Sequence, residues 1–183
     1  MKIVVIEPLG VKQEALDTLA SEILPQGAEV VYYGNRAGST QELIERGKDA
    51  DVIIVANQPL PAEAIRGFEK LKLLSVAFTG YDHVAMDACR EKGVVVCNCA
   101  GYSTAAVADL TFGLILSLYR NIGECDRRIR QGGTKAGLIG PELEGKKFGV
   151  IGAGAIGQRV IRIAQAFGCE VYAYSRTRKE IPG

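Results

Sequence analysis

The chain has 183 residues, of which 48% are hydrophobic, and its 22 basic and 21 acidic side chains give a net charge of +1. This length allows one generous domain, or one domain and part of another, with enough apolar residues for a buried core. There is no basic excess or basic stripe, which argues against a nucleic-acid binder, and the longest apolar stretch, 105–119, contains Asp109 and is too short to span a bilayer.

The first hundred residues alternate between apolar runs and amphipathic segments. The runs are rich in Val and Ile and cover 2–8, 29–33, 51–56, 73–78 and 94–99. The segments between them have apolar residues three or four apart, which is typical of helices. Near-continuous hydrophobic strands alternating with helices predict a parallel sheet covered on both faces. We therefore interpret residues 1–99 as an α/β domain with a flavodoxin-like, doubly wound parallel sheet.

Several residues mark the expected helix ends in this first part. Ser39 and Thr40 are N-cap candidates, and Pro61 is expected in a first helical turn. Gly47 and Gly93 are expected to close helices at their C-terminal ends.

The pattern changes after residue 100. Residues 103–122 are expected to form one long helix that begins at Ser103 and is apolar around most of its circumference, which is typical of a helix buried between layers or at an interface. A shorter basic helix over 124–131 and a glycine-containing loop follow. A second strand–helix series then begins at "KKFGVIG", and its second strand is "EVYAYS", 170–175. We interpret residues 100–183 as the first part of a Rossmann dinucleotide-binding domain.

The glycine turn of this second series fits G-x-G-x-x-G with Gly152, Gly154 and Gly157. It follows a strand, opens a helix and precedes a second strand, which is the context that the fingerprint requires. The first glycine permits the tight turn, the second lets the backbone approach a pyrophosphate, and the third lets the helix lie close to the strand. Backbone N–H groups of Ala155 and Ile156 are expected to meet the phosphates. The alternative is a merely tight turn.

The end of the second strand bears on the choice of cofactor. NAD sites normally have an acidic residue there, whereas this chain has Ser175 followed by Arg176. A carboxylate would repel a 2′-phosphate, and a Ser with flanking Arg side chains could bind one. The sequence therefore favours NADP over NAD, with an ordinary basic loop as the alternative.

Five cysteines are present, an odd number without the spacing of a metal site. The N-terminal apolar run is too short for a signal peptide. We expect reduced thiols, no metal and a cytoplasmic protein.

Three stretches resemble the D-isomer-specific 2-hydroxyacid dehydrogenases. They are "AFTGYDHV" (77–84), "CNCAGYSTAAVADLTFGLIL" (97–116) and "GPELEGKKFGVIGAGAIG" (140–157), and their order and spacing also match. The resemblance implies a substrate domain formed by the first hundred residues plus a C-terminal return segment that this chain lacks. It also implies a dinucleotide domain between those two parts, and a homodimer formed through that domain.

The resemblance further implies roles for individual residues. The loop formed by Phe78, Thr79 and Gly80 would bind the carboxylate of a small 2-keto or 2-hydroxy acid. Tyr102 and Thr104 would lie near the nicotinamide.

The family's catalytic Arg, His and Glu or Asp would all lie beyond residue 183, and His83, the single histidine, does not correspond to the catalytic one. The resemblance thus implies a fragment of an oxidoreductase that transfers hydride between NAD(P)H and a 2-keto acid, with this chain alone inactive. The alternative is a non-catalytic dinucleotide-sensing or partner-binding protein on the same scaffold.

Overall fold

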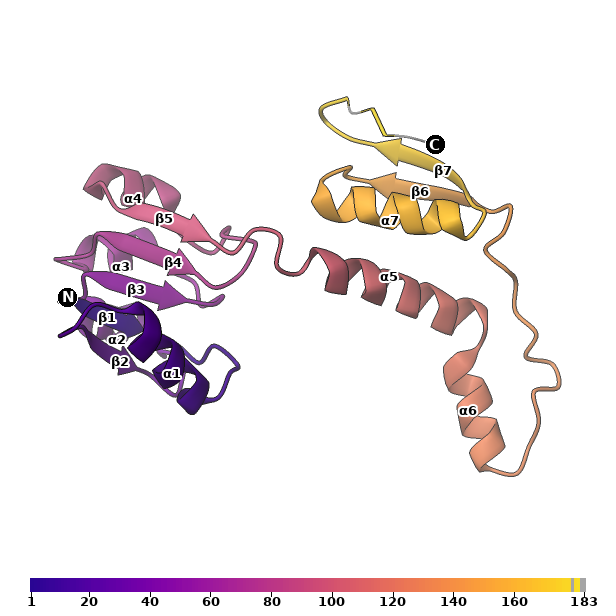
Figure 1. Ribbon diagram of the computed structural model, residues 1–183, viewed down its shortest axis with the longest axis horizontal. Helices are drawn as coiled ribbons and strands as arrows, with labels where there is room; N and C mark the ends of the chain where they lie inside the picture. The colour runs from indigo at the N-terminus through magenta and orange to yellow at the C-terminus, as the bar shows by residue number, and fades with distance from the viewer. Residues whose placement is uncertain (179, 182–183) are drawn as a thin grey trace. The chain divides into compact units, whose positions relative to one another are not determined.

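The computed structural model describes residues 1–178 and 180–181 (Figure 1). The chain divides into two compact units, Met1–Ala100 and Gly101–Gly183. Each unit has its own parallel sheet and its own hydrophobic core.

The first unit contains a five-stranded parallel sheet in the order β2-β1-β3-β4-β5. This 2-1-3-4-5 order is that of flavodoxin-like folds, so the predicted fold class is confirmed. The strands are shorter than their apolar runs and are β1 (Lys2–Val5), β2 (Glu29–Tyr32), β3 (Val52–Val55), β4 (Leu73–Val76) and β5 (Val95–Asn98).

Four helices connect these strands and lie on the two faces of the sheet (Figure 1). They are α1 (Gln13–Ile23), α2 (Thr40–Gly47), α3 (Ala62–Gly67) and α4 (Met86–Lys92). Helices α2, α3 and α4 pack side by side over the face formed by fully buried residues such as Val4, Ile53 and Leu74. On the other face, α1 has no buried residue and Val95 of the edge strand β5 is 59% exposed. Only one face of this sheet is therefore tightly covered by the described chain.

The helix ends expected at Ser39 and Gly93 are confirmed, and the one expected at Pro61 differs by one residue. Ser39 accepts a hydrogen bond from the N–H of Glu42, and Gly93 ends α4 in the left-handed conformation with a φ of 69°. Pro61 occupies the N-cap position, one residue before the first turn of α3. Gly47 also closes a helix, as expected, although its backbone is not in the left-handed conformation. It is the last residue of α2, where a Cβ would come within 2.6 Å of the Phe68 ring, so close packing explains the glycine.

The second unit is built around the two-stranded parallel sheet of β6 (Lys147–Ile151) and β7 (Glu170–Tyr174), connected by α7 (Ala155–Ala166). One face of this sheet packs on α7, which in turn packs on α5 (Thr104–Tyr119). Phe112 of α5 stacks between Phe148 and Phe167, with ring centroids 5.7 and 5.4 Å away. Among the described residues no helix or strand packs on the opposite face of this sheet, and Ile151 is 89% exposed there.

The prediction of one helix over 103–122 was wrong at its C-terminal end. Helix α5 stops at Tyr119, and a second helix, α6 (Ile122–Arg130), begins after a bend of 58°. Asn121 takes the left-handed conformation at the bend, with a φ of 52°, and its Nδ2 donates to the carbonyl of Leu138 at 3.0 Å. Ser103 occupies the N-cap position of α5, but its side chain makes no capping bond.

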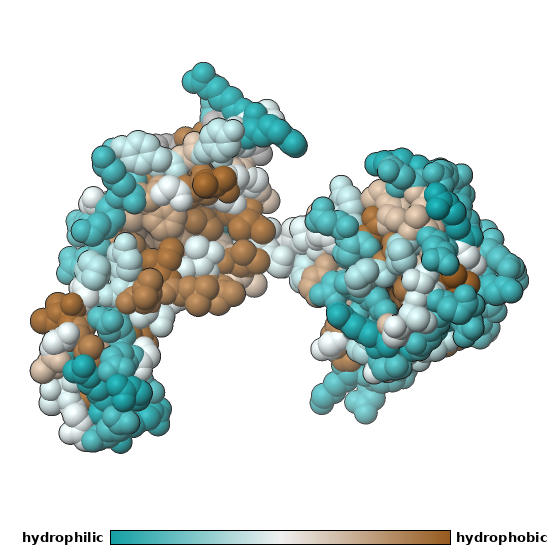
Figure 2. Space-filling view, turned by 180° about the vertical axis from the view of Figure 1, so that it is seen from behind, coloured by the Kyte–Doolittle hydropathy of each residue, from teal (hydrophilic) through white to brown (hydrophobic). Residues whose placement is uncertain are grey.

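Helix α5 is also less buried than its composition predicts. Only Ala108 and Phe112 are buried, whereas Leu110, Leu114 and Leu118 are each more than 60% exposed. Figure 2 shows a broad hydrophobic area on the visible face of this unit, at the level of α5. Within the described residues no single helix is long and apolar enough to cross a membrane, although the bent pair α5–α6 passes that test by length and composition.

Candidate functional site

The glycine turn between β6 and α7 has the geometry that a phosphate-binding turn needs. Gly152 has a φ of 99°, which side-chain-bearing residues rarely adopt, and its N–H bonds to the carbonyl of Tyr174 at the end of β7. A Cβ on Gly157 would overlap the carbonyl oxygen of Gly152, whereas a Cβ on Gly154 would meet no atom within 4 Å. Gly157 therefore permits close packing, and Gly154 leaves open space at the N-terminus of α7.

The N-terminus of α7 carries unused hydrogen-bond donors. The first N–H groups of a helix have no intrahelical partner, and here they belong to Ala155, Ile156 and Gly157. No side chain caps this end, and no acidic residue lies in the first turn. The positive end of the helix dipole and these N–H groups together favour an anion such as a phosphate.

A cavity of about 310 Å³ lies beside the glycine turn, at the carboxyl ends of β6 and β7. Ser175 lines it, as expected for a residue that contacts the cofactor ribose, and Tyr174 and Arg178 are the other lining residues with polar side chains. Arg176 is exposed and is not among the lining residues. Within the described residues Arg178 is thus the basic residue among those that line this cavity. The full lining is Ala153, Ala173, Tyr174, Ser175, Arg178 and Ile181.

The expected substrate loop, Phe78–Gly80, follows β4 at the carboxyl edge of the first sheet. It is tied to the end of β5, because Asn98 Nδ2 donates to the carbonyl of Thr79 at 2.7 Å and the N–H of Cys99 donates to the carbonyl of Phe78 at 3.1 Å. Gly80 is exposed, and its N–H has no hydrogen-bond partner in the part of the chain that the structure describes. This rigid loop can therefore offer a backbone donor to an anion.

The other expected site residues lie in the second unit. Tyr102 is 59% exposed and precedes α5, and Thr104 is the first residue of that helix. The structure brings Gly152, Gly154, Gly157 and Ser175 together at one end of the β6–β7 sheet, and it places the Phe78–Gly80 loop at the corresponding edge of the first sheet.

His83 lies in the loop between β4 and α4 of the first unit. Its Nε2 is buried and has no hydrogen-bond partner among the described residues, so no carboxylate orients the imidazole as an acid–base group would require. Among these same residues no three His, Cys, Asp or Glu side chains lie close enough to hold a metal ion.

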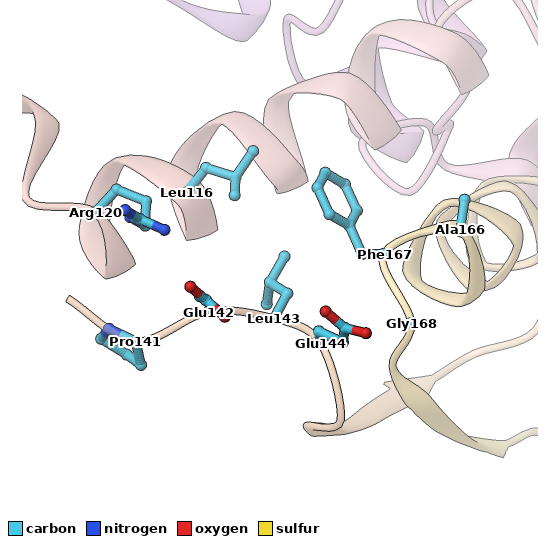
Figure 3. Close-up of a pocket in the computed structure, with 9 residues that line it drawn as sticks. All are labelled: Leu116, Arg120, Pro141, Glu142, Leu143, Glu144, Ala166, Phe167 and Gly168. Atoms are coloured by element: carbon cyan, nitrogen blue, oxygen red, sulfur yellow. The ribbon is translucent and has the colours of Figure 1, made fainter.

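A larger cavity of about 500 Å³ lies at the opposite end of the second unit, beneath the C-terminal end of α5 (Figure 3). Apart from Leu116 and Arg120, its lining residues come shortly before β6 and β7, so it lies at the amino ends of those strands. The charged side chains there are Arg120, Glu142 and Glu144, all exposed, and the Glu142 carboxylate lies on the Arg120 side of the opening (Figure 3). Ligands of open parallel sheets bind at the carboxyl ends of the strands, so this cavity is not the candidate site.

Sequence reasoning missed a buried carboxylate at the carboxyl edge of the first sheet. The side chain of Glu7 is 1% exposed and accepts hydrogen bonds from three backbone N–H groups and from Arg36. The sequence did contain a signal for this carboxylate. An acidic residue near the end of the otherwise apolar run 2–8 must either be exposed to solvent or have hydrogen-bond partners.

The sequence profile described as "D-isomer specific 2-hydroxyacid dehydrogenase, catalytic domain" matches residues 3–181. The chain belongs to the D-isomer-specific 2-hydroxyacid dehydrogenase family. A hydroxypyruvate reductase of Blautia hydrogenotrophica is 33% identical to this chain over 183 residues, which cover 95% of the chain and 56% of that relative. The chain spans about half the length, or less, of the curated relatives that it matches.

Solved structures match the chain over both units. An acyclic imino acid reductase in complex with NADPH and D-Arg has a TM-score of 0.86 and 27% identity, and covers 99% of this chain and 58% of its own. An NAD⁺-bound 3-phosphoglycerate dehydrogenase of Entamoeba histolytica has a TM-score of 0.77 and 32% identity, with 98% and 55% of the two chains covered. These two structural neighbours thus hold a nicotinamide dinucleotide in different forms, NADPH in one and NAD⁺ in the other.

Proposed function

We propose that this chain supplies the substrate domain and the first part of the dinucleotide-binding domain of a D-2-hydroxyacid dehydrogenase. The enzyme would transfer a hydride between NAD(P)H and a small 2-keto acid. The observation that carries this proposal is the uncapped N-terminus of α7, which follows the Gly152–Gly157 turn and adjoins a cavity at the carboxyl ends of β6 and β7. The family match supports this proposal, because the matching family is described as one of D-isomer specific 2-hydroxyacid dehydrogenases.

The residues of this chain would bind and orient the reactants. The dinucleotide supplies the hydride when it is bound. The N–H groups of Ala155 and Ile156 would hold the pyrophosphate, and Ser175 would contact the adenosine ribose. The loop Phe78–Gly80 would hold the substrate carboxylate, with Tyr102 and Thr104 beside the nicotinamide.

The preference for NADP rests on the cavity at the end of β7. Ser175 stands where NAD enzymes carry an acid, and Arg178 lines the same cavity, so a 2′-phosphate would meet a cation and no carboxylate.

We expect Arg178→Ala to weaken NADPH binding about tenfold or more and to leave NADH binding nearly unchanged, because a charge-assisted hydrogen bond to phosphate is lost. Arg66→Ala, at a position 56% exposed in the first unit, is the control. Isothermal titration calorimetry of each variant with NADPH and with NADH measures the two affinities. If the parent chain binds NADH more tightly than NADPH, the proposed preference is wrong.

We also propose that the 183-residue chain binds the cofactor without turning over 2-keto acids. Its single histidine, His83, has no partner that would orient it within the described residues, and the resemblance implies a catalytic Arg, His and acid beyond residue 183. NADPH consumption with glyoxylate, hydroxypyruvate or pyruvate should stay at the background rate for the purified chain and rise for the complete gene product. Dinucleotide binding without turnover in the complete gene product would favour the sensing or partner-binding alternative.

The proposal extends to assembly and location. We propose a homodimer formed through the second unit, because α5 exposes an apolar stripe there. We propose the cytoplasm as the compartment, where the five free cysteines would stay reduced.

A further inference from the structure

The cavity at the amino ends of β6 and β7 lies between the C-terminal ends of two helices (Figure 3). Arg120 is the C-cap residue of α5 and Phe167 is the C-cap residue of α7, and both line the cavity. The segment 141–144 forms its third side. With a volume of about 500 Å³, the cavity is in the size range that holds small molecules.

The walls of this cavity are fixed by close backbone contacts. A Cβ on Gly140 would come within 1.5 Å of the carbonyl oxygen of Tyr119, so this glycine lies directly against the end of α5. The N–H of Gly145 donates to the carbonyl of Gly168 at 2.9 Å, just after α7. Between these two points the side chain of Leu143 is buried in the hydrophobic core of the second unit. The segment is therefore anchored on both sides, and a ligand would meet a preorganised cavity.

Three charged side chains of the lining have no partner of opposite charge. Arg120, Glu142 and Glu144 make no side-chain hydrogen bond or ion pair with any other described residue. In the neighbouring helix α6, by contrast, three arginines each pair with an acidic residue of the same helix. A cation and a carboxylate that line one cavity without touching each other can be bridged by a ligand that carries both charges.

The charged groups lie at two ends of the cavity. Figure 3 shows Arg120 and Glu142 toward one end and Glu144 toward the other, on the side of Gly168. The Glu144 side chain lies against Gly168, because a Cβ there would be only 3.2 Å from the Cγ of Glu144. Leu116 and Phe167 add apolar surface between the two ends.

The charges of the lining select the class of ligand. One guanidinium and two carboxylates make the lining net negative, which disfavours a phosphate or a dinucleotide. The two helix C-termini add partial negative charge, which favours an ammonium group. The guanidinium of Arg120 still offers donors that match a single carboxylate. A zwitterion satisfies both ends of the cavity, and the apolar surface between them fits a hydrocarbon side chain.

The cavity and the exposed leucines of α5 lie on different sides of that helix. Leu116 follows Leu114 by two residues, and Arg120 follows Leu118 by two residues. Two residues correspond to a turn of about 200° around a helix, so each pair points in nearly opposite directions. A dimer formed through the exposed leucines would therefore leave the cavity open.

We propose that this cavity binds an α-amino acid with an apolar side chain. Arg120 binds its carboxylate, Glu144 binds its ammonium group, and Leu116 and Phe167 contact its side chain. This site does not depend on the proposed function. The dinucleotide turn lies at the other end of α7, which has 12 residues and is about 18 Å long.

The first experiment compares L-leucine with two analogues that each lack one charge. Each compound is titrated into the 15N-labelled 183-residue chain, and the backbone amides of residues 142–144 and 167–168 are followed by NMR. We expect saturable shifts with L-leucine. The amine 3-methylbutylamine and the acid 4-methylpentanoate should bind about tenfold more weakly or worse, because each loses one charge-assisted contact. No saturable shift up to the solubility limit of L-leucine, or equal affinity for either analogue, would overturn the proposal.

The second experiment assigns the two charged contacts. Arg120→Gln should weaken L-leucine binding about tenfold without weakening that of the amine, and Glu144→Gln should weaken both. Arg162→Gln and Asp109→Asn are matched controls, because both residues are exposed in the second unit and lie outside the lining. Unfolding temperatures close to that of the parent chain show that the variants are folded. Equal losses in the controls would contradict the assignment.

The third measurement separates this site from the dinucleotide turn. The L-leucine titration is repeated with saturating NADPH, and we expect the same affinity because the two sites lie at opposite ends of α7. Displacement of L-leucine by NADPH would overturn the proposal, because it would show that both compounds bind at one site. A chain that binds L-leucine but no dinucleotide would contradict the proposed function and leave the amino-acid site supported.

Discussion

At the scale of single residues, the three glycines of the turn before α7 have different physical roles. Gly152 needs its positive φ, Gly157 needs the absence of a Cβ against the Gly152 carbonyl, and Gly154 has open space around it. The sequence motif assigns these roles in general terms. The structure shows which of them concerns folding and which leaves room for a ligand.

We therefore expect opposite phenotypes from two similar substitutions. Gly157→Ala should destabilise the second unit by about 1–3 kcal/mol, because the new Cβ overlaps a backbone oxygen that cannot move independently. Gly154→Ala should leave the unfolding temperature almost unchanged and weaken dinucleotide binding, because the methyl group would occupy the space of the pyrophosphate. Thermal unfolding and NADPH titration of both variants measure the two effects. Unimpaired binding by Gly154→Ala would argue against a phosphate at this turn.

The cysteines give a second test at this scale. Cys97 and Cys99 are exposed, whereas Cys89 is 1% exposed and its burial raises the pKa of its thiol. Since the thiolate is the reactive form, we expect a disulfide reagent at pH 8 to modify Cys97 and Cys99 quickly and Cys89 only after unfolding. Peptide mapping after timed labelling gives the order. Fast labelling of Cys89 in the folded chain would show that α4 opens readily.

At the scale of elements, the start of α2 combines local sequence and long-range contacts. Ser39 accepts from the N–H of Glu42, and the Glu42 carboxylate accepts in return from the N–H of Gly38 at 2.7 Å. This is close to a capping box, and it was readable from "STQE". Glu42 also pairs with Arg46, which bonds the loop after β2. The cap therefore helps to fix the loop that carries Arg36.

This cap predicts a dependence of stability on pH. The backbone N–H of Gly38 and, next, the Arg46 side chain lower the pKa of Glu42 below its ordinary value. A lowered folded pKa means stabilisation that is complete above the unfolded pKa of about 4.3 and is lost as the pH falls through the folded value. We expect Glu42→Gln to lower the unfolding temperature at pH 7, with the difference from the parent chain shrinking below about pH 4. Glu63→Gln in α3 serves as a control. A difference in unfolding temperature that does not change with pH would contradict the assignment of this stabilisation to the Glu42 carboxylate.

The elements also show what could be predicted from sequence. The spacing of apolar residues was sufficient to predict the strands and most of the helices. A parallel sheet that is buried on both faces has strands that read as continuous apolar runs in the sequence. The end of α5 was not predictable in this way. A Cβ on Gly140 would overlap the carbonyl of Tyr119, so the helix ends where a distant loop packs against it, and Asn121 turns the chain there. The partners of Glu7 were hidden for the same reason, because they follow other strands.

At the scale of the whole molecule, each unit has a sheet with one poorly covered face. In the second unit this surface includes Ile151, which is 89% exposed, and Tyr174, which is 70% exposed. The same unit exposes Leu110, Leu114 and Leu118, which are spaced four residues apart and so lie on one side of α5. A few hundred Å² of such surface corresponds to several kcal/mol at about 25 cal/mol per Å².

We expect the chain to self-associate through this stripe, formed by Leu110, Leu114 and Leu118. Two copies related by a twofold axis can pack this stripe against the same stripe of the partner. Such a dimer is closed, because no part of the stripe is left exposed for a third copy to bind. Burying three leucines from each copy is worth several kcal/mol, enough to offset part of the cost of association at micromolar concentration. Sedimentation velocity should therefore give about twice the 19.6 kDa mass of the chain.

Leu114→Glu should yield a folded monomer, because it would bury two like charges across the axis. Leu19→Glu on α1, at a position 51% exposed in the first unit, should leave the dimer intact. A parent chain that sediments as a monomer while β6, α7 and β7 remain protected from hydrogen exchange would refute the expectation.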